Sequence, residues 1–152
     1  MAPPGFVVAT WLTRRRTPRQ QASGVADVVK YAYSHHISRK TRPISWIKAA
    51  RKAFEQFPQA VQLEALRALT IAAEGEKADV AKPLQGLGSG VMELALRHKG
   101  DAWRVVYAVQ IGSDIWVLHA FQKKSKSGIA TPSHEIELVR ERLKRLKEML
   151  HE

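Results

Sequence analysis

The sequence predicts a single α+β domain in which a two-helix hairpin and a C-terminal helix pack on a small, mainly antiparallel sheet. Apolar residues recur at helical spacing on both sides of Pro58 and again near the C-terminus. Three strand-like segments lie between these helical stretches, and the short connections between them imply antiparallel pairing. A chain of 152 residues with 45% hydrophobic side chains can bury one core of this kind. The predicted order of elements is β-α-α-β-β-β-α.

The first predicted elements are a short strand and two helices. Residues 44–47 form the strand, which leads into a helix that Pro58 ends. The apolar stripe of this helix is Ile47, Ala50, Phe54 and Phe57. Pro58 also suits the first turn of a second helix, where its missing N–H is not needed, and Gly75 suits the end of that helix. The second apolar stripe is Leu63, Leu66, Leu69 and Ala73.

Three strands are predicted after a glycine-rich loop at residues 82–90. The first strand alternates in the manner of a half-buried strand, with Met92, Leu94 and Leu96 on one face and Glu93, Ala95 and Arg97 on the other. The second strand covers residues 102–111 and the third residues 115–121. A C-terminal helix follows, with Thr131 as its predicted cap, Pro132 at its first position, and Glu135 and Glu137 near the positive end of its dipole. Its apolar stripe is Ile136, Val139, Leu143, Leu146 and Leu150.

The net charge of +11 is concentrated in residues 1–43, which hold eight basic residues and one acidic residue. This segment has weak periodicity and three early prolines. We interpret it as a poorly packed extension of a domain at residues 44–152, and two alternatives remain: a nucleic-acid-binding arm, or a true start that lies further downstream. The overall basic surplus indicates a polyanionic partner, with nucleic acid first and an anionic membrane surface second.

Composition excludes several classes of protein. The absence of cysteine excludes disulfide frameworks, thiolate zinc sites and cysteine nucleophiles, and it fits a cytoplasmic protein. The chain has neither an apolar run long enough to span a membrane nor the residue order of a secretory signal. The glycine-rich run at residues 86–90 is followed by a strand instead of a helix, so it is interpreted as a flexible connection and not as a phosphate loop. The six histidines show no metal-ligand spacing, so no metal or other cofactor is expected.

A group of basic residues on the last two strands and the segment after them is the main candidate for chemistry. It comprises Arg97, Arg104, Lys123, Lys124 and Lys126, with Tyr107, His119 and Phe121 nearby. Arg104 interrupts an apolar strand and needs a carboxylate such as Glu93 or an anionic ligand. Strand alternation places His119 on the face of Ile115, Val117, Phe121 and Lys123, where a hydrogen-bonded, partly buried histidine is the favoured interpretation. For the lysines, a solvated loop remains the alternative.

Four segments carry a resemblance to a known family: residues 81–86, 103–107, 117–126 and 128–132. With these segments, the chain from Pro43 to Leu150 resembles the phage-derived HigB-like branch of the RelE/ParE toxin superfamily. The resemblance implies a RelE-like fold and a type II toxin that cleaves mRNA in the ribosomal A site without a metal. It also implies a cognate antitoxin, expected to be of the helix-turn-helix type, in a hetero-oligomer with the toxin.

The resemblance also implies roles for individual residues. Arg104 and Lys123 occupy the places of the family's phosphate-binding cations, and His119 or Tyr107 would act in proton transfer. The expected RNA contacts are Lys82, Arg97, Lys124, Lys126 and Phe121, with Trp103 as an alternative to Phe121 for stacking on a base. The chain lacks the tyrosine that RelE-type members carry near the last helix, and His134 is an outside candidate there. The runner-up functions are a non-nucleolytic, ParE-like inhibitor of DNA gyrase and an inactive accessory protein of a phage or mobile element.

Overall fold

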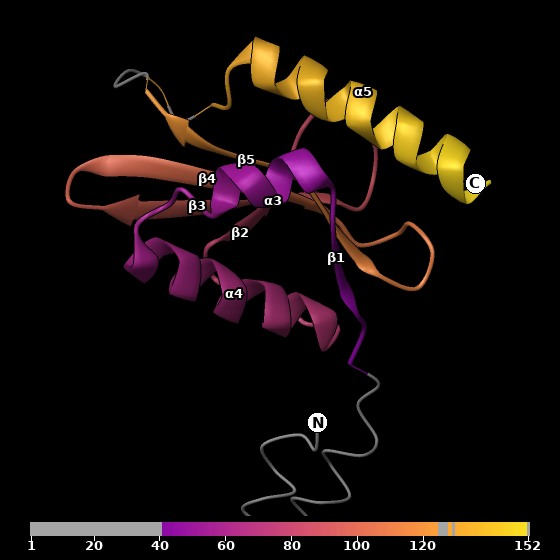
Figure 1. Ribbon diagram of the computed structural model, residues 1–152, viewed down its shortest axis with the longest axis horizontal. Coiled ribbons are helices and arrows are strands. Elements are labelled where there is room, and N and C mark those ends of the chain that lie inside the picture. Colours follow the sequence, from indigo (N-terminus) through magenta and orange to yellow (C-terminus); the bar gives the residue numbers. More distant parts are fainter. Residues whose placement is uncertain (1–40, 125–127, 129, 152) are drawn as a thin grey trace, which may run out of the picture. The chain divides into compact units, whose positions relative to one another are not determined.

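The protein is described by a computed structural model that covers residues 41–124, 128 and 130–151. The predictions made for residues 1–40 and for Lys126 lie outside these residues. The described part consists of a sheet with helices on both faces (Figure 1). Its elements are β1 (Ile44–Trp46), α3 (Lys48–Phe54), α4 (Gln59–Ala73), β2 (Ala81–Pro83), β3 (Val91–His98), β4 (Asp101–Ala108), β5 (Ile115–Lys123) and α5 (Ser133–Leu150).

The sheet has five strands in the order β1-β5-β4-β3-β2. β1 pairs with β5 in parallel, and the other neighbouring strands are antiparallel, so the predicted α+β class with a mainly antiparallel sheet is confirmed. One short strand, β2, lies where a loop was predicted. It is only three residues long, and it ends at Pro83, which cannot donate to a ladder and therefore suits an edge strand.

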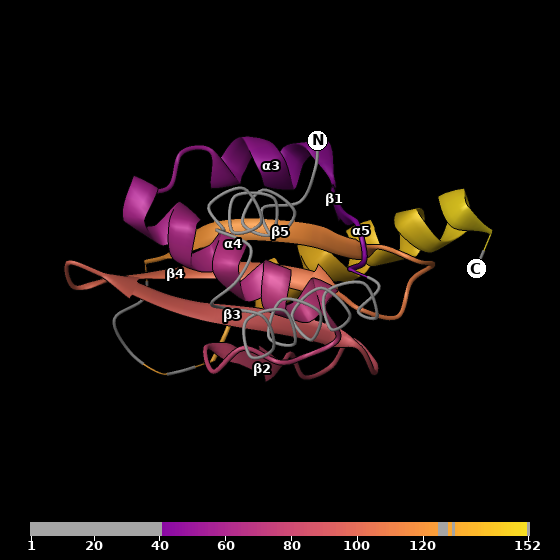
Figure 2. The same cartoon turned by 90° about the horizontal axis from the view of Figure 1, so that it is seen from below.

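Helices α3 and α4 cover one face of the sheet, as the view from that side shows (Figure 2). The predicted apolar stripe of α4 is partly wrong, because Leu63 and Leu66 are 51% and 42% exposed. The helix packs through a face rich in small residues, which lets its backbone approach the sheet closely. The buried residues of this face are Val61, Ala65, Ala68, Leu69, Ala72 and Ala73. The helical spacing of apolar residues does not show which of the two apolar faces of α4 is buried.

Helix α5 covers the opposite face of the sheet (Figure 1). Its buried residues Val139, Leu143 and Leu146 form a second core with residues of the loop after β2 and of the strands. The layer formed by this helix covers the strand face of Glu93, which has no exposed surface. The predicted cap also differs: Pro132 is the capping residue, while the hydroxyl of Thr131 donates to the carboxylate of Glu93.

A β-bulge divides β5 into two parts that face different layers. Val106 pairs with His119 and Tyr107 with Val117, so Leu118 is the extra residue. The predicted alternation along β5 is therefore wrong beyond Val117. Ile115 and Val117 face the α3–α4 layer, whereas His119 contacts α5 and Phe121 packs in the α5 core.

Arg42 belongs structurally to the domain, although the sequence interpretation placed it in the extension. Its backbone N–H donates to the carbonyl of Ala73 at 2.9 Å. Its guanidinium donates to the carbonyls of Ser113 and Asp114, each at 2.8 Å. These bonds tie the residues before β1 to the end of α4 and to the turn before β5. Among the described helices, none has the length and apolar character needed to cross a bilayer.

Candidate functional site

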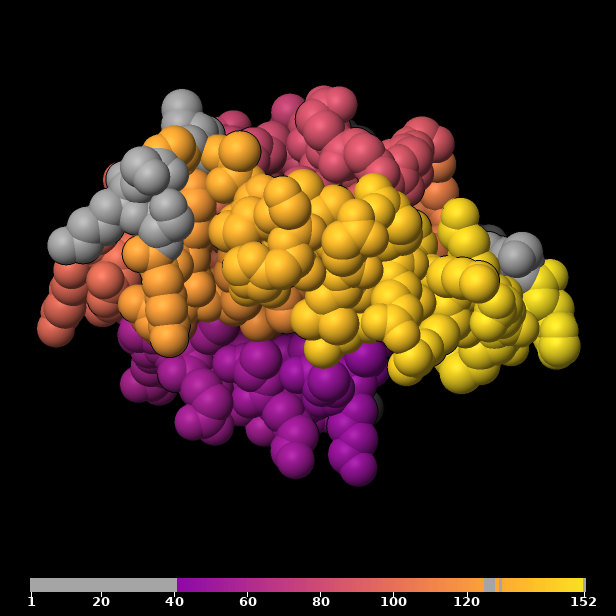
Figure 3. All heavy atoms as spheres, turned by 90° about the horizontal axis from the view of Figure 1, so that it is seen from above, coloured from indigo at the N-terminus to yellow at the C-terminus, as the bar shows by residue number. Residues whose placement is uncertain are grey.

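The candidate residues gather on the α5 face of the sheet, toward the end of β5. Three adjacent rows of paired residues cross β3, β4 and β5 here: Glu93–Val106–His119, Ala95–Arg104–Phe121 and Arg97–Ala102–Lys123. The bulge at Leu118 is what turns the β5 members of these rows toward α5. Seen from this side, the end of β5 emerges beside the N-terminal end of α5 (Figure 3).

Arg104 is buried, with 4% of its surface exposed, and it forms an ion pair with Glu93. Its Nε lies 3.3 Å from Oε1 of Glu93, and Nζ of Lys82 lies 3.3 Å from the same oxygen. Thr131 donates to the other carboxylate oxygen. Glu93 is thus the carboxylate partner that the sequence interpretation demanded for Arg104. Two cations share one carboxylate, so the cluster keeps a net positive charge.

A pocket of about 420 Å³ lies at the end of β5. Its lining consists of Phe121, Gln122, Lys123, Lys124, Pro132, His134 and Glu135. Nζ of Lys123 donates to the carbonyl of Gly128 at 2.5 Å. Lys123 is buried, with 7% of its surface exposed, whereas Lys124 is exposed. The pocket therefore combines two cations, an aromatic ring and a carboxylate, a combination that can hold an anion beside a proton acceptor.

His119 lies behind this pocket and has partners at both ring nitrogens. Nε2 lies 2.5 Å from Oε2 of Glu135, and Nη1 of Arg142 lies 3.0 Å from Nδ1. A guanidinium can only donate, so Nδ1 accepts and Nε2 carries the proton that is donated to Glu135. Burial lowers the pKa of His119 below its usual 6.5, although Glu135 acts in the opposite direction. The ring stacks on Phe121, with centroids 4.9 Å apart. His119 is therefore a neutral, fully hydrogen-bonded histidine near neutral pH.

Arg142 joins the imidazole to the bulge. The same Nη1 that faces His119 donates to the carbonyl of Leu118 at 2.9 Å. A bulge leaves the extra residue out of the ladder, and here a guanidinium from α5 satisfies its carbonyl. Burial lowers the pKa of Arg142, and Glu135 and Glu141 offset part of that effect. Arg142 thus holds both the backbone and the side chain that orient Glu135.

The other predicted site residues do not line the pocket, and they lie at different places on the sheet. Tyr107 is 1% exposed and belongs to the core on the α3–α4 face, and burial raises the pKa of its phenol. Its position does not support a role in proton transfer on the α5 face. Trp103 lies on the same face as Tyr107 and packs against Phe57, with ring centroids 4.7 Å apart. Arg97 is exposed one row from Arg104, and Lys82 reaches the site only through Glu93.

Two residues of this site, Glu135 and Arg142, were not singled out as functional candidates from the sequence. Glu135 was interpreted only as a favourable charge at the start of the helix. The two residues are seven positions apart, which places them on one face of a helix, two turns from each other. That spacing was visible in the sequence, but nothing in it indicated that this face meets His119. The other residue of α5 that lines the pocket, His134, donates from Nε2 to Oε1 of Glu135 at 3.2 Å.

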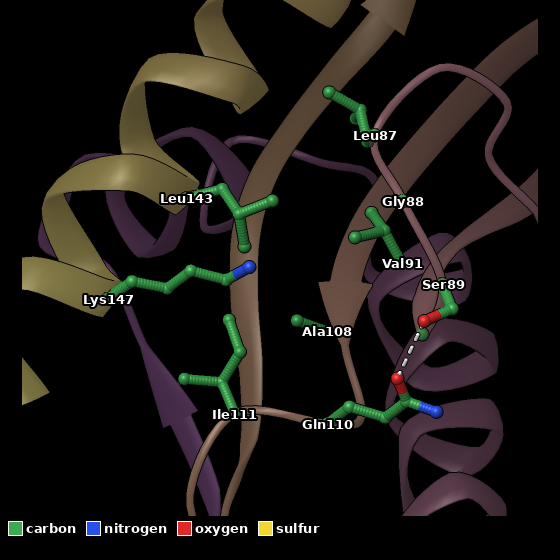
Figure 4. A pocket seen from close by; sticks show the side chains of 10 residues that line it. Leu87, Gly88, Ser89, Val91, Ala108, Gln110, Ile111, Leu143 and Lys147 are labelled. Atoms are coloured by element: carbon green, nitrogen blue, oxygen red, sulfur yellow. Dashed lines mark hydrogen bonds between the residues drawn. The ribbon is translucent and has the colours of Figure 1, made fainter. Parts of the chain in front are cut away.

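A second hollow, of about 270 Å³, lies at the other end of the α5 face, between the glycine-rich loop and the C-terminal half of α5 (Figure 4). Ser89 donates to the side chain of Gln110 at 3.0 Å across its rim, and Lys147 points toward it. Gly90 has φ +79°, and a Cβ there would lie 2.7 Å from Gln110. The loop thus closes against a strand end, as expected of a connection, and the hollow holds no acid–base pair.

No group of three or more histidine, aspartate or glutamate side chains is placed to hold a metal within the described residues. The pocket holds two lysines and a carboxylate, and an imidazole lies next to that carboxylate. Such groups can stabilise negative charge and transfer protons.

Comparisons with known proteins match the chain to a family of phage-derived proteins and find similarity to two solved structures. A family model described as phage derived protein Gp49-like (DUF891) matches residues 52–144. A mutant of the E. coli toxin RelE in the free state is 18% identical, with 69% of this chain and 97% of that chain covered and a TM-score of 0.49. The RelBE2 toxin–antitoxin complex from Mycobacterium tuberculosis is 16% identical, with 56% and 94% covered and a TM-score of 0.39. No curated protein matches the chain.

Proposed function

Since the chain belongs to the Gp49-like family of phage-derived proteins, we propose that it is the toxin of a type II toxin–antitoxin pair and that it cleaves mRNA on the ribosome. The observation that carries this proposal is the pocket at the end of β5, where Lys123, Lys124 and Phe121 lie beside the carboxylate of Glu135. Cations and an aromatic ring suit the phosphate and base of a single-stranded RNA.

The proposed reaction is the attack of a ribose 2′-hydroxyl on the adjacent phosphate. A bond forms between the 2′-oxygen and phosphorus, and the bond from phosphorus to the 5′-oxygen of the next nucleotide breaks. The products are a 2′,3′-cyclic phosphate and a 5′-hydroxyl. Negative charge grows on the phosphate oxygens in the transition state, so fixed cations in a partly desolvated pocket stabilise that state more than the substrate.

We assign the predicted residues to this reaction according to their positions. Lys123 faces the pocket and stabilises the developing charge, while the exposed Lys124 holds the RNA backbone. Lys126, which lies outside the described residues, keeps the role in RNA binding that the family resemblance implies. Arg104 contributes its positive charge from behind Phe121, because its guanidinium is already paired with Glu93. Arg97 and Lys82 extend the basic surface along the neighbouring strands.

The partners of the protein follow from the same proposal. Its substrate is mRNA in the ribosome, and a cognate antitoxin of the helix-turn-helix type neutralises it in a hetero-oligomer in the cytoplasm. We propose further that residues 1–40 are an extension of the toxin domain and are not part of the reaction.

The proposal is tested by adding the purified chain to translating ribosomes and mapping the new ends of a defined mRNA. We expect cleavage by the wild type and a loss of roughly 100-fold or more in the double variant with Lys123→Ala and Lys124→Ala, the scale on which a lost transition-state contact acts. Lys144→Ala is the matched control, because this lysine is 77% exposed on α5 and lies outside the pocket.

Two other outcomes would replace the proposal. Intact mRNA together with inhibited DNA supercoiling would identify a gyrase inhibitor. Intact mRNA with neither translation nor supercoiling affected would identify an inactive accessory protein.

A further inference from the structure

The proposed cleavage needs a group that takes the proton of the 2′-hydroxyl. Only a few of the residues that line the pocket can do so. Its lysines are cations and cannot accept a proton. His119 uses both ring nitrogens in bonds to Glu135 and Arg142. Among the described lining residues, the remaining proton acceptors are His134, whose side chain is 78% exposed, and Glu135, whose side chain is 17% exposed. Glu135 is the more enclosed and the better oriented of the two.

The carboxylate of Glu135 is held in place by a chain of donors. Arg142 donates to Nδ1 of His119, and this fixes the proton of the imidazole on Nε2, which faces Oε2 of Glu135 at 2.5 Å. The other oxygen, Oε1, faces His134 at the edge of the pocket, 3.2 Å away. A carboxylate oriented by a second residue, which is itself oriented by a third, is the usual arrangement of an active-site base.

We propose that Glu135 is the catalytic base for the attacking 2′-hydroxyl and that His119 and Arg142 are its positioning residues. This inference rests on the proposed nuclease function and names a group that performs one step of it. The Glu135 carboxylate takes the 2′-proton as the bond from oxygen to phosphorus forms. The 5′-oxygen leaves with a proton from water, and the resulting hydroxide takes the proton back from Glu135.

Glu135 has cationic and neutral groups around it. The groups that face it are His119, Lys123 and Lys124 from β5 and its end, and His134 and Arg142 from its own helix. All of them are cationic or neutral. Lys123 and Lys124 lie in the same pocket, so a phosphate bound by the lysines would lie within reach of the carboxylate.

The test compares Glu135→Gln with the wild type in single-turnover cleavage on the ribosome. Glutamine keeps the size of the side chain but accepts protons poorly, so we expect a rate lower by roughly 100- to 10,000-fold, the range of general acid–base catalysis. Binding of an mRNA with a 2′-deoxy nucleotide at the cleavage site should stay within about 3-fold, since the lysines are intact. Glu135→Asp should keep part of the rate and exclude misfolding as the cause.

The matched control is Glu137→Gln on the same helix. Its side chain is 66% exposed, and it pairs with Arg140 outside the pocket, so its rate should equal that of the wild type. A Glu135→Gln variant that cleaves at the wild-type rate would overturn the assignment while leaving the nuclease function standing. A wild type that does not cleave would overturn both.

The positioning roles have a readout of their own, the pKa of His119 measured by NMR titration. Glu135 raises this pKa and Arg142 lowers it. The pKa of His119 should therefore fall in Glu135→Gln and rise in Arg142→Gln, and Arg142→Gln should lower the cleavage rate with little effect on binding of the deoxy mRNA. Shifts in the opposite directions, or an unchanged rate in Arg142→Gln, would contradict the positioning roles.

Discussion

Glu93 connects three segments of the chain through one buried carboxylate. Lys82 reaches it from β2, Arg104 from β4, and Thr131 from the segment before α5. A carboxylate with no exposed surface is unfavourable unless positive charge and hydrogen bonds compensate it, and here both are present. The residue that was predicted as a possible carboxylate partner of Arg104 is therefore the centre of a buried ionic cluster.

Replacing Glu93 with glutamine should destabilise the protein strongly. The amide can still accept from Thr131, but Arg104 loses its countercharge while it stays buried. We expect the free energy of unfolding to fall by about 3 kcal/mol or more, as when one partner of a buried ion pair is removed. Urea denaturation measures this change. Glu55→Gln is the control, because its ion pair with Arg51 is exposed and should contribute no more than about 1 kcal/mol. Equal effects in both variants would contradict the role of Glu93.

At the scale of elements, α4 presents apolar residues on two faces, and only one face is buried. Leu69 has no exposed surface, whereas Leu66, three positions earlier, is 42% exposed. We expect Leu69→Ala to lower the free energy of unfolding by about 2–5 kcal/mol, because it leaves a cavity in the core. Leu66→Ala should change it by less than about 1 kcal/mol. Thermal or chemical denaturation of the two variants checks the orientation of the helix, and a larger effect at Leu66 would contradict it.

The elements themselves could be predicted from the sequence because each has a strong local signal. Pro58 separates α3 from α4, and Gly75 follows the end of α4 with φ +88°. Lys99 and Gly100 both have positive φ in the turn between β3 and β4, as a two-residue hairpin requires. Such signals depend only on residues that are close together in the sequence, so they can be recognised without knowledge of the tertiary structure.

The sides that the elements face were harder to predict, because they depend on tertiary packing. The bulge at Leu118 has no local signature in the sequence, so strand alternation placed His119 with Ile115 and Val117 on the wrong layer. The site was predicted in part: Lys123, Lys124 and Phe121 do line one pocket. The partnership of His119 with Glu135 joins β5 to α5 and could not be derived from spacing along either element.

At the scale of the whole molecule, stability should decrease as the pH falls, through two groups with lowered pKa values. Burial lowers the pKa of His119 in the folded protein below 6.5. At a pH between the folded pKa and 6.5, the imidazole is therefore protonated in the unfolded chain but neutral in the folded protein. Hydrogen bonds from Ser45 and Ser113 lower the pKa of Asp114, with the same sign below 3.8. The stability that neutral His119 contributes is therefore fully present above pH 6.5 and is lost as the pH falls toward the pKa of His119 in the folded protein.

Urea denaturation between pH 7.5 and pH 5 checks this expectation. The free energy of unfolding should fall over this range in the wild type and fall less in His119→Gln. Asp114→Asn should behave like the wild type here and differ from it only in stronger acid. Stability that rises on acidification, or an equal decrease in wild type and His119→Gln, would contradict the assigned pKa direction.

The bulge in β5 makes the number of residues in this strand as important as their identity. The part before Leu118 fills the core beneath α3 and α4, and the part after it supplies the pocket under α5. Loss of Leu118 would remove the bulge and restore simple alternation, and the imidazole, the aromatic ring and Lys123 would still face α5, because Val106 would still pair with His119 and Tyr107 with Val117. Relatives that keep the site can therefore lose the bulge or vary the loops around β5, but one residue more or fewer elsewhere in the strand would exchange core residues with reactive ones beyond the change.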